Sequence, residues 1–464
     1  AIIGLPSNLF TNTGIPVVVI ILKKNRKFDD PVLIIDASHS FIKVGKQNVL
    51  QEKDIAKIVD TYVERREEEG YSHLATHEEI RKNEYNMNIP RYIQANEEEI
   101  PHDVDAHLLG GIPQKNIDNL KVLQSTVPDV LKRSLKEIRE GYVELLKPVE
   151  EISNDVLSDA RIVEISKEIE SKTKNYIDKY WDVLRNVDKS SSLTQLMDDM
   201  LVEIKQILSS FQYIDVYDGY QIVAEIWKNT LAHDAEIIKS SGFYTAGRTR
   251  EPNMVTKGSG NKKREEQDGW VGSIVPNELI EKNLYGDERK EIESKKARIQ
   301  EIETKLSELV EAAKEEDSDE ANALGECLNE AGEAFESKSI KAALKKASKE
   351  TVEYDLLKKV EKLFADKSAL NKAVKADEKA LKESVQERIL TLTNEEIDNL
   401  MYEKWFGNMV DAIVGLVWKP IKKELDTLQM LHNRYADTLS AIDEEIQESE
   451  SALEAMMREL VVEE

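Results

Sequence analysis

Cysteine and long apolar runs are scarce in this chain. Its 464 residues include one cysteine, Cys327, which excludes an internal disulfide framework and any zinc site built from several thiolates. The longest near-continuous apolar stretch, residues 15–22, is far below the roughly 18 residues that a spanning helix needs. The start also lacks the basic segment of a secretion signal. We therefore expect a cytoplasmic protein with no membrane segment.

Nucleotide-binding glycine loops are missing as well. The sequence contains neither Gly-x-Gly-x-x-Gly nor Gly-x-x-x-x-Gly-Lys-Ser/Thr, the loops that hold dinucleotides and triphosphates. The one cluster of possible metal ligands is His102-Asp103-x-Asp105-x-His107, beside a glycine pair. Because it lacks a second, distant pair of ligands, we interpret it as a turn with capping side chains and expect no metal.

Positive charge is in short supply overall. Lys and Arg number 64 against 90 Asp and Glu, for a net charge of −26, which excludes a protein that coats nucleic acid through general basicity. The negative charge is unevenly distributed along the chain. Residues 1–93 carry 13 basic and 13 acidic side chains, so the whole excess of negative charge lies in the later residues. We expect the two portions to face different partners.

The first portion contains runs that are typical of strands. Residues 17–22 and 32–35 are short β-branched stretches bounded by turn residues, and continuous runs without alternation predict strands buried on both faces. Only one convincing helix follows, at residues 51–69. One helix cannot cover both faces of a sheet, so we expect the rim of a larger sheet whose other strands lie upstream, and hence a truncated chain.

The remaining residues show mainly helical periodicity. Composition and spacing divide the chain into an α/β segment at 1–95, a helical middle region at 96–239, a flexible loop at 240–273, a coiled-coil hairpin at 274–390 and C-terminal helices at 391–464. The loop is rich in glycine and basic residues, so either it follows phosphates or it is a solvated connector. Its candidate DNA contacts are Arg248, Arg250, Lys262, Lys263 and Arg264.

Two segments of the second half carry a heptad pattern. Apolar residues from Ile292 to Leu309 and from Val360 to Val385 recur at steps of three, four and seven, which predicts an antiparallel pair of long helices. Thr393-Asn394-Glu395-Glu396 fits an N-cap with acidic residues in the first turn of a further helix. Residues 425–460 form another long amphipathic pattern, which we interpret as bundle packing, with an exposed docking helix as the alternative.

Several ordered motifs resemble one known family, the modification subunits of type I restriction-modification systems. The first is the opening segment from Ile2 to Phe10, which continues through Thr13-Gly14-Ile15-Pro16-Val17. The others are Val32-Leu33-Ile34-Ile35-Asp36, Asn88-Ile89-Pro90-Arg91-Tyr92, Asp103-Val104-Asp105-Ala106-His107, Gly269-Trp270-Val271-Gly272 and Leu392-Thr393-x-Glu395-Glu396. Together these motifs extend the resemblance over nearly the whole chain.

The resemblance implies an N6-adenine DNA methyltransferase that flips its target base and uses S-adenosylmethionine. The fold implied is mainly α with an N-terminal α/β remnant, in which residues 1–95 form edge strands of a Rossmann-like class I methyltransferase sheet. The family's glycine-rich cofactor loop is not found, and none of the 11 prolines adjoins another. The catalytic Asn/Asp-Pro-Pro-Phe/Tyr tetrapeptide is therefore absent, no residue of this chain is assigned to catalysis or cofactor binding, and we expect the chain alone to be inactive.

One part of the implied active site does match this sequence. Phe10 corresponds to the aromatic residue that stacks on the flipped base, and Asn12 and Thr13 follow it as candidate DNA contacts. Stacking contributes about 1 to 3 kcal/mol per base. The alternative is that Phe10 caps the core of the sheet.

The resemblance also implies partners. The acidic helices would dock on a specificity subunit, in a complex with a second modification subunit and a restriction subunit, and DNA would be contacted through that complex. A different hypothesis is a structural coiled-coil scaffold for subunit docking without a catalytic role.

Overall fold

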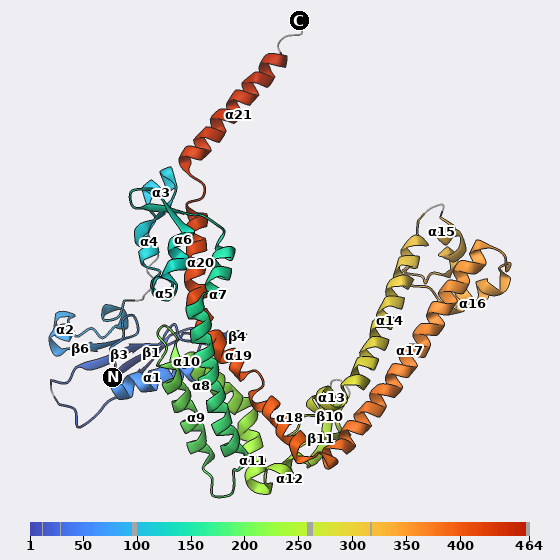
Figure 1. Cartoon of the computed structure of the whole chain (residues 1–464), viewed down its shortest axis with the longest axis horizontal. Helices are drawn as coiled ribbons and strands as arrows, with labels where there is room; N and C mark the ends of the chain where they lie inside the picture. The colour runs from blue at the N-terminus through green and yellow to red at the C-terminus, as the bar shows by residue number, and fades with distance from the viewer. Residues whose placement is uncertain (12, 28, 95–99, 258–262, 316–317, 461–464) are drawn as a thin grey trace. The chain divides into compact units, whose positions relative to one another are not determined.

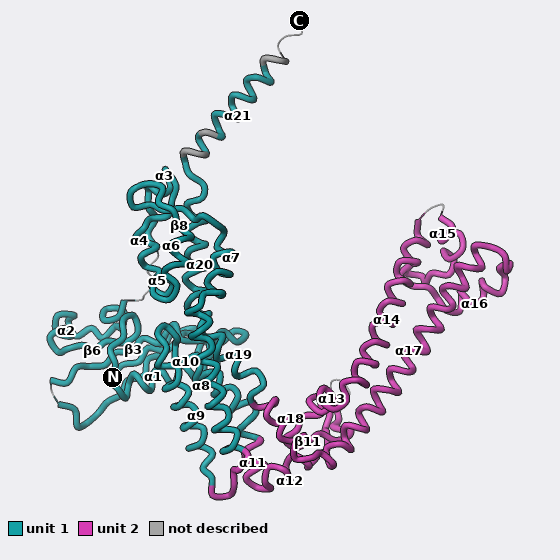
Figure 2. Tube along the Cα trace, in the orientation of Figure 1, with its two compact units in different colours: residues 1–184, 191–233, 406–464 teal, residues 185–190, 234–405 magenta. Residues whose placement is uncertain are grey.

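The computed structural model describes residues 1–464 except 12, 28, 95–99, 258–262, 316–317 and 461–464. The chain divides into two compact units, coloured separately in Figure 2. Unit 1 comprises residues 1–184, 191–233 and 406–464, and unit 2 comprises residues 185–190 and 234–405.

A four-stranded sheet holds the N-terminal part of unit 1 (Figure 1). Its strand order is β2 (Val17–Ile20), β1 (Ile2–Leu5), β3 (Val32–Asp36) and β6 (Ser72–Ala75). Strand β1 runs parallel to β3, whereas β2 and β6 are antiparallel to their neighbours. A separate hairpin of β4 (Ile42–Val44) and β5 (Gln47–Val49) follows β3.

Strand β3 forms the centre of this sheet's packing. Leu33, Ile34 and Ile35 are fully buried. Leu33 and Ile35 share a core with the inner face of α1 (Glu52–Glu64), while Ile34 packs on the other side of the sheet against Ile80 and Ile93. The predicted burial of this run on both faces is therefore confirmed.

The predicted burial of residues 17–22 is wrong. The strand β2 forms, but Val18, Val19 and Ile20 are 49%, 42% and 62% exposed. Strand β2 is an edge strand of the described sheet and pairs only with β1 there. A β-branched run predicts a strand, but burial depends on what packs against it.

The middle region contains a small sheet that the helical periodicity did not predict. Strands β7 (Ile112–Pro113), β9 (Tyr142–Leu145) and β8 (Leu135–Arg139) pair in that order. Gly141, at φ +79°, makes the tight turn between β8 and β9, a conformation that favours glycine. The region at 96–239 is thus helical with a sheet inserted.

Helices make up the rest of unit 1. In chain order they are α2 (His77–Lys82), η1 (Ile89–Arg91), α3 (Val104–Leu109), α4 (Gln114–Asp118), α5 (Lys121–Thr126), α6 (Pro128–Ser134), α7 (Val149–Leu157), α8 (Ala160–Arg185), α9 (Leu193–Leu208), α10 (Val216–Ile226), η2 (Trp227–Leu231), α19 (Met409–Val414), η6 (Gly415–Val417), α20 (Trp418–Arg434) and α21 (Leu439–Leu460). Helix α10 packs on α1 and α9. Asp218 of α10 accepts a hydrogen bond from Lys53 Nζ of α1 at 2.9 Å and another from Lys419.

Unit 2 is built around two long helices, α14 (Gly286–Ala312) and α17 (Val352–Arg388), which lie side by side in Figure 1. Ile292, Leu306 and Leu309 of α14 and Val360 and Val374 of α17 are buried. Its other elements are α11 (Ala232–Ser241), α12 (Phe243–Gly247), β10 (Arg250–Lys257), β11 (Arg264–Gly272), α13 (Asn277–Leu284), α15 (Asp319–Leu324), η4 (Gly325–Cys327), α16 (Ser337–Lys346), η5 (Ile389–Thr391) and α18 (Asn394–Phe406). The two long helices form a packed pair, and a coiled-coil supertwist stays a prediction.

The prediction of a flexible loop at 240–273 is wrong for most of its described residues. They form α12 and the antiparallel hairpin of β10 and β11. Two of its glycines allow close packing: a Cβ on Gly269, at φ +80°, would lie 2.3 Å from Gln386 Nε2, and one on Gly272 would lie 2.2 Å from the Val275 carbonyl oxygen. Glycine frequency alone does not distinguish close packing from mobility.

The predicted start of α18 at Thr393 is confirmed. The Glu396 N–H donates to Thr393 Oγ1 at 3.2 Å, and the Thr393 N–H donates to Glu396 Oε2 at 2.7 Å, which is a reciprocal capping box. Among the described residues, no helix combines the length and apolar character needed to cross a lipid bilayer.

Candidate base-stacking site

The loop between β1 and β2 carries the candidate stacking residue. Phe10 lies in this loop, and its side chain is 56% exposed. The ring is not part of the hydrophobic clusters on either face of the sheet. An exposed aromatic ring is open to a partner that stacks on it, so the exposure favours the stacking interpretation over a cap on the core.

The hairpin of β4 and β5 supports the start of this loop. Asn48 Nδ2 donates to the Ser7 carbonyl at 2.8 Å, and the Asn48 N–H donates to the Asn8 carbonyl at 3.1 Å. Asn48 is 7% exposed, and Asn8 has a left-handed backbone with φ 53°. This role of Asn48 cannot be predicted from the sequence, because an asparagine in a short strand has many possible partners.

The site lies where parallel strands end. Strand β1 ends at Leu5 and the parallel strand β3 ends at Asp36. The Ala37 N–H donates to the Gly4 carbonyl at 2.9 Å, and Asp36 Oδ1 accepts from the Ser38 N–H at 3.0 Å. The carboxyl ends of parallel strands are the usual place for ligands in open α/β sheets. The loop that bears Phe10 leaves the sheet from this edge.

Two further candidate DNA contacts, Asn12 and Thr13, follow Phe10 in the sequence. Thr13 lies in the same loop: its N–H donates to the Phe10 carbonyl at 3.5 Å and its Oγ1 accepts from Ile15 at 3.4 Å. Asn12 lies outside the described residues. Phe10 and Thr13 are therefore brought together on one short loop.

The residues present do not fit a cradle for S-adenosylmethionine. The loops after β1 and β3 begin Pro6-Ser7 and Ala37-Ser38, without the glycine-rich turn that lets a backbone approach a cofactor.

The basic candidates of unit 2 are mostly engaged within that unit. Arg248 Nε donates to the Leu392 carbonyl at 2.7 Å, and Arg250 donates to the Gln386 carbonyl at 2.8 Å while lying over the Trp270 ring. These two arginines hold the hairpin onto neighbouring helices, so the prediction that they contact DNA gains no support.

The basic residues at the tip of the same hairpin are more open. Arg264 pairs with Glu266 at 2.7 Å and is largely exposed, Lys263 is exposed, and Lys262 lies outside the described residues.

Asp103, His102 and His107, three of the possible metal ligands, make contacts that stabilise the local fold. Asp103 Oδ1 caps α3 by accepting from the Ala106 N–H at 3.1 Å and from the Tyr142 hydroxyl at 2.9 Å. Burial opposes ionisation of Asp103, but these bonds and the nearby Lys115 outweigh it and lower its pKa. His102 Nδ1 and His107 Nε2 lie 2.9 Å apart in stacked rings. In the part of the chain that the structure describes, no three His, Cys, Asp or Glu side chains are placed so that they could hold one metal ion.

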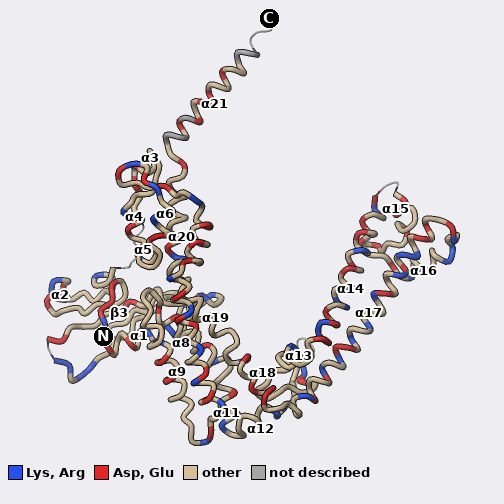
Figure 3. The backbone as a smooth tube through the Cα atoms, viewed as in Figure 1, with Lys and Arg blue, Asp and Glu red and all other residues tan. Residues whose placement is uncertain are grey.

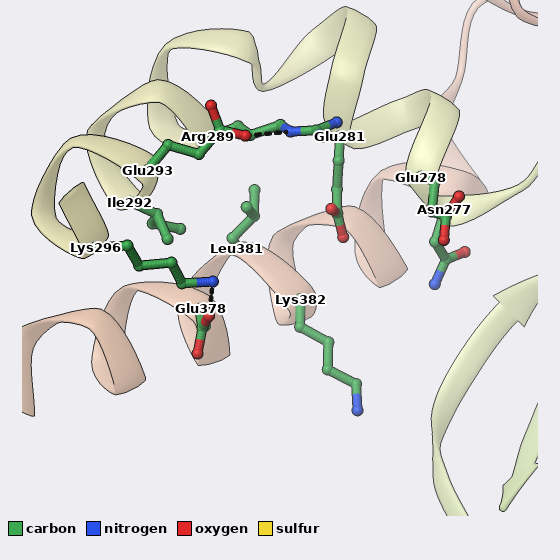
Figure 4. Close-up of a pocket in the computed structure, with 10 residues that line it drawn as sticks. All are labelled: Asn277, Glu278, Glu281, Arg289, Ile292, Glu293, Lys296, Glu378, Leu381 and Lys382. Atoms are coloured by element: carbon green, nitrogen blue, oxygen red, sulfur yellow. Dashed lines mark hydrogen bonds and ion pairs between the residues drawn. The ribbon is translucent and has the colours of Figure 1, made fainter. Parts of the chain in front are cut away.

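A groove of about 620 Å³ lies between α13, α14 and α17 (Figure 4). Four of its charged side chains form two pairs: Arg289 Nε donates to Glu293 at 3.1 Å, and Lys296 contacts Glu378 at 2.6 Å. Lys382, which also lines the groove, pairs with Asp268 at 2.7 Å. Each basic side chain of the lining therefore has a carboxylate partner.

Comparison with known proteins places the resemblance in the N-terminal part of the chain. The N-6 DNA Methylase family model matches residues 1–100. The type I restriction enzyme MpnII methylase subunit of Mycoplasma pneumoniae is 33% identical over 132 residues, which is 28% of this chain and 24% of that protein. The MjaVII methylase subunit of Methanocaldococcus jannaschii is 37% identical over 149 residues, or 31% of this chain and 23% of that protein.

A solved structure gives a further match. The type I restriction-modification methyltransferase subunit of Streptococcus thermophilus is 49% identical over 20% of each chain, with a TM-score of 0.20. The matched part spans about a quarter or less of these relatives. The resemblance to modification subunits of type I restriction-modification systems, predicted from the motifs, is thus confirmed for the matched part of the chain, which includes the methylase segment at residues 1–100. Its extension over nearly the whole chain stays a prediction.

Proposed function

We propose that this chain is part of a modification subunit that transfers a methyl group from S-adenosylmethionine to N6 of adenine in DNA. The observation that carries the proposal is the position of Phe10: it lies within the methylase segment, 56% exposed, on a loop at the carboxyl edge of the sheet. A base that has left the duplex loses its stacking neighbours, and an aromatic ring replaces them. The chain supplies this stacking surface, while the cofactor and catalytic groups come from sequence that it does not contain.

The proposal is tested by Phe10→Ala in an enzyme that includes the cofactor and catalytic motifs, assembled with its specificity subunit. Loss of stacking worth about 1 to 3 kcal/mol corresponds to a fall in methyl transfer of roughly fivefold to 160-fold. Phe10→Trp keeps a stacking ring and should retain most activity. Tyr85→Ala, which removes another exposed aromatic ring, is the matched control. Unchanged turnover in Phe10→Ala would favour the scaffold hypothesis instead.

The isolated chain should show no methyl transfer. Because it lacks the Pro-Pro tetrapeptide and the glycine-rich loop, labelled S-adenosylmethionine and duplex DNA should give background counts. Robust incorporation by this chain alone would contradict the division of labour proposed here.

The C-terminal helix α21 is proposed to dock on the specificity subunit, within a complex that includes a second modification subunit and a restriction subunit. Five apolar side chains form one exposed stripe at helical spacing, with exposed fractions from 42% to 59%. They are Leu439, Ile442, Ile446, Leu453 and Met457. Stripes of this kind usually pack against a partner helix.

Charge substitutions on that stripe test the docking. Ile442→Asp with Ile446→Asp places two carboxylates in the apolar contact and should abolish co-purification with the specificity subunit. Glu448→Lys changes charge on the opposite face of α21 and should leave co-purification intact. Equal behaviour of the two variants would contradict docking through the stripe.

A further inference from the structure

A basic surface stands out in this acidic chain, at the end of unit 2 that holds α15 and α16. Residues 337–376 contain 11 lysines against five acidic residues, a local charge of +6 in a protein of −26. Helix α16 alone has four lysines and no acidic residue. Figure 3 shows these lysines in blue along α16 and α17. The preceding residues 313–336 carry nine acidic residues and one lysine, and α15 within them packs on α17. The positive charge is therefore confined to residues 337–376, on α16 and the first part of α17.

The fold exposes these lysines on the outside of α16. Ile340 is fully buried, and it packs with Leu357 and Val360 of α17. Residues 338, 341 and 345 fall on the opposite side of the helix, because steps of three and four return to one face. Lys338, Lys341 and Lys345 are all exposed.

The outer face of α17 continues the basic surface. Lys358, Lys362 and Lys372 are exposed, and the positions between them on this face, Ala365 and Ala369, are exposed alanines. Alanine leaves room for a bulky partner to approach the helix. The acids of this part of the helix are Glu353, Asp355, Glu361 and Asp366, and they do not outnumber the lysines.

A groove of about 720 Å³ joins the two helices. It is lined by Lys367, Lys372 and Lys375 together with Ser337, Ser368, Asn371 and Phe364. Lys367 pairs with Glu303 at 2.8 Å. Within the described ranges, Lys372 and Lys375 form no ion pair, and neither do the lysines of α16. These ammonium groups therefore remain available to an external anion.

We infer that this lysine surface, made of Lys338, Lys341, Lys345, Lys362, Lys372 and Lys375, binds the phosphate backbone of duplex DNA without reading its sequence. Lysine, serine and asparagine side chains are phosphate ligands. Residues 337–376 contain no arginine, whose bidentate contacts read guanine and mark protein interfaces. The choice of DNA rather than another polyanion rests on the proposed function. The surface would then hold the duplex at a second place, outside the methylase segment.

The test uses the full chain and a fluorescein-labelled 30-base-pair duplex, without cofactor or specificity subunit. Fluorescence anisotropy is measured at several salt concentrations between 25 and 200 mM. The wild-type chain should bind two unrelated sequences equally and lose affinity steeply with salt. Lys338→Gln, Lys341→Gln and Lys345→Gln combined should weaken binding on the order of a hundredfold and lower the salt slope by about 3, since each phosphate contact contributes about 0.9.

A matched control removes three lysines that already have carboxylate partners. Lys136, Lys290 and Lys305 are exposed and pair with Glu144, Asp287 and Glu301, so their change to Gln alters net charge equally. This control should bind like wild type. The inference would be overturned if both triple variants lost the same DNA affinity, or if the wild-type chain did not bind DNA at 25 mM salt. Tighter binding of an acidic peptide or of duplex RNA than of DNA would also overturn it.

The outcome is separable from that of the proposed function. The binding assay needs no methyl transfer, and Phe10→Ala should leave duplex binding by the chain unchanged. If methylation proves independent of Phe10 while the lysine variant still loses DNA, the surface stands and the proposed function fails. Loss of methylation with Phe10→Ala, together with unaffected binding in the lysine variant, gives the reverse result.

Discussion

Removal of the Asp234 carboxylate should open one region of unit 2. Asp234 is 1% exposed and accepts hydrogen bonds from Lys404 Nζ at 2.6 Å and from Trp405 Nε1 at 2.8 Å. Lys404 also donates to the Ile274 carbonyl at 2.7 Å. The carboxylate therefore holds α18 against α11 and against the segment after β11.

The loss of stability expected for Asp234→Ala comes from the two donors that lose their acceptor. An ammonium group whose side chain is only 18% exposed loses its counter-charge, and an indole N–H loses its acceptor. Removing one partner of a buried ion pair costs about 3 to 5 kcal/mol. At about 4 kcal/mol, amide exchange in α18 should accelerate roughly a thousandfold if exchange proceeds through local opening.

Hydrogen–deuterium exchange with mass spectrometry is the suitable assay, because a chain with two units need not unfold in a single step. Lys404→Met added to Asp234→Ala removes the orphaned charge and should restore a large part of the protection. Unchanged exchange in the single variant, or a double variant as exposed as the single one, would refute the reasoning that buried charge pairing holds this region.

Two further predictions concern unit 1. Asn48→Asp replaces the Nδ2 donor to the Ser7 carbonyl with an acceptor, at a cost of about 1 to 3 kcal/mol. Amides of residues 7–11 should therefore exchange at least several times faster, and unchanged rates would show that the β4–β5 hairpin does not support the Phe10 loop. Burial opposes ionisation of Asp218, but hydrogen bonds from two lysines outweigh it and hold its pKa below 3.8. The unfolded pKa is the higher one, so the contribution of Asp218 to stability is complete above about pH 5 and is lost as pH falls through the folded value. The thermal stability of wild type relative to Asp218→Asn should therefore shrink below pH 4, and a constant difference from pH 7 to pH 3 would contradict this assignment.

Patterns of neighbouring residues correctly predicted strands, helices and a helix cap, because these elements form mainly through contacts between residues close in sequence. The β-branched runs lie in strands β2 and β3, and the residues with heptad spacing lie in helices α14 and α17. Thr393 and Glu396 formed their capping box. These features depend on residues within a few positions of one another, so the sequence contains all that they need.

The same patterns failed where two distant segments decide the outcome. Strands β2 and β3 have similar composition, yet only β3 is covered on both faces. The glycines at 269 and 272 signalled a loop but allow close contacts with Gln386 and Val275. Arg250 looked like a phosphate ligand and instead donates to the carbonyl of Gln386. In each case the deciding neighbour cannot be identified from spacing.

For the candidate sites too, some features depend on the sequence alone and others on the tertiary structure. The sequence by itself determined the resemblance, the candidacy of Phe10 and the surplus of lysine in residues 337–376, because residue identity and order are sufficient for these. Only the tertiary structure decided that the Phe10 ring is exposed, that Asn48 supports its loop, and that the lysines of α16 share one open face without carboxylate partners. Exposure and pairing depend on which segments pack together, and that packing is set by the whole buried core rather than by any single stretch of sequence.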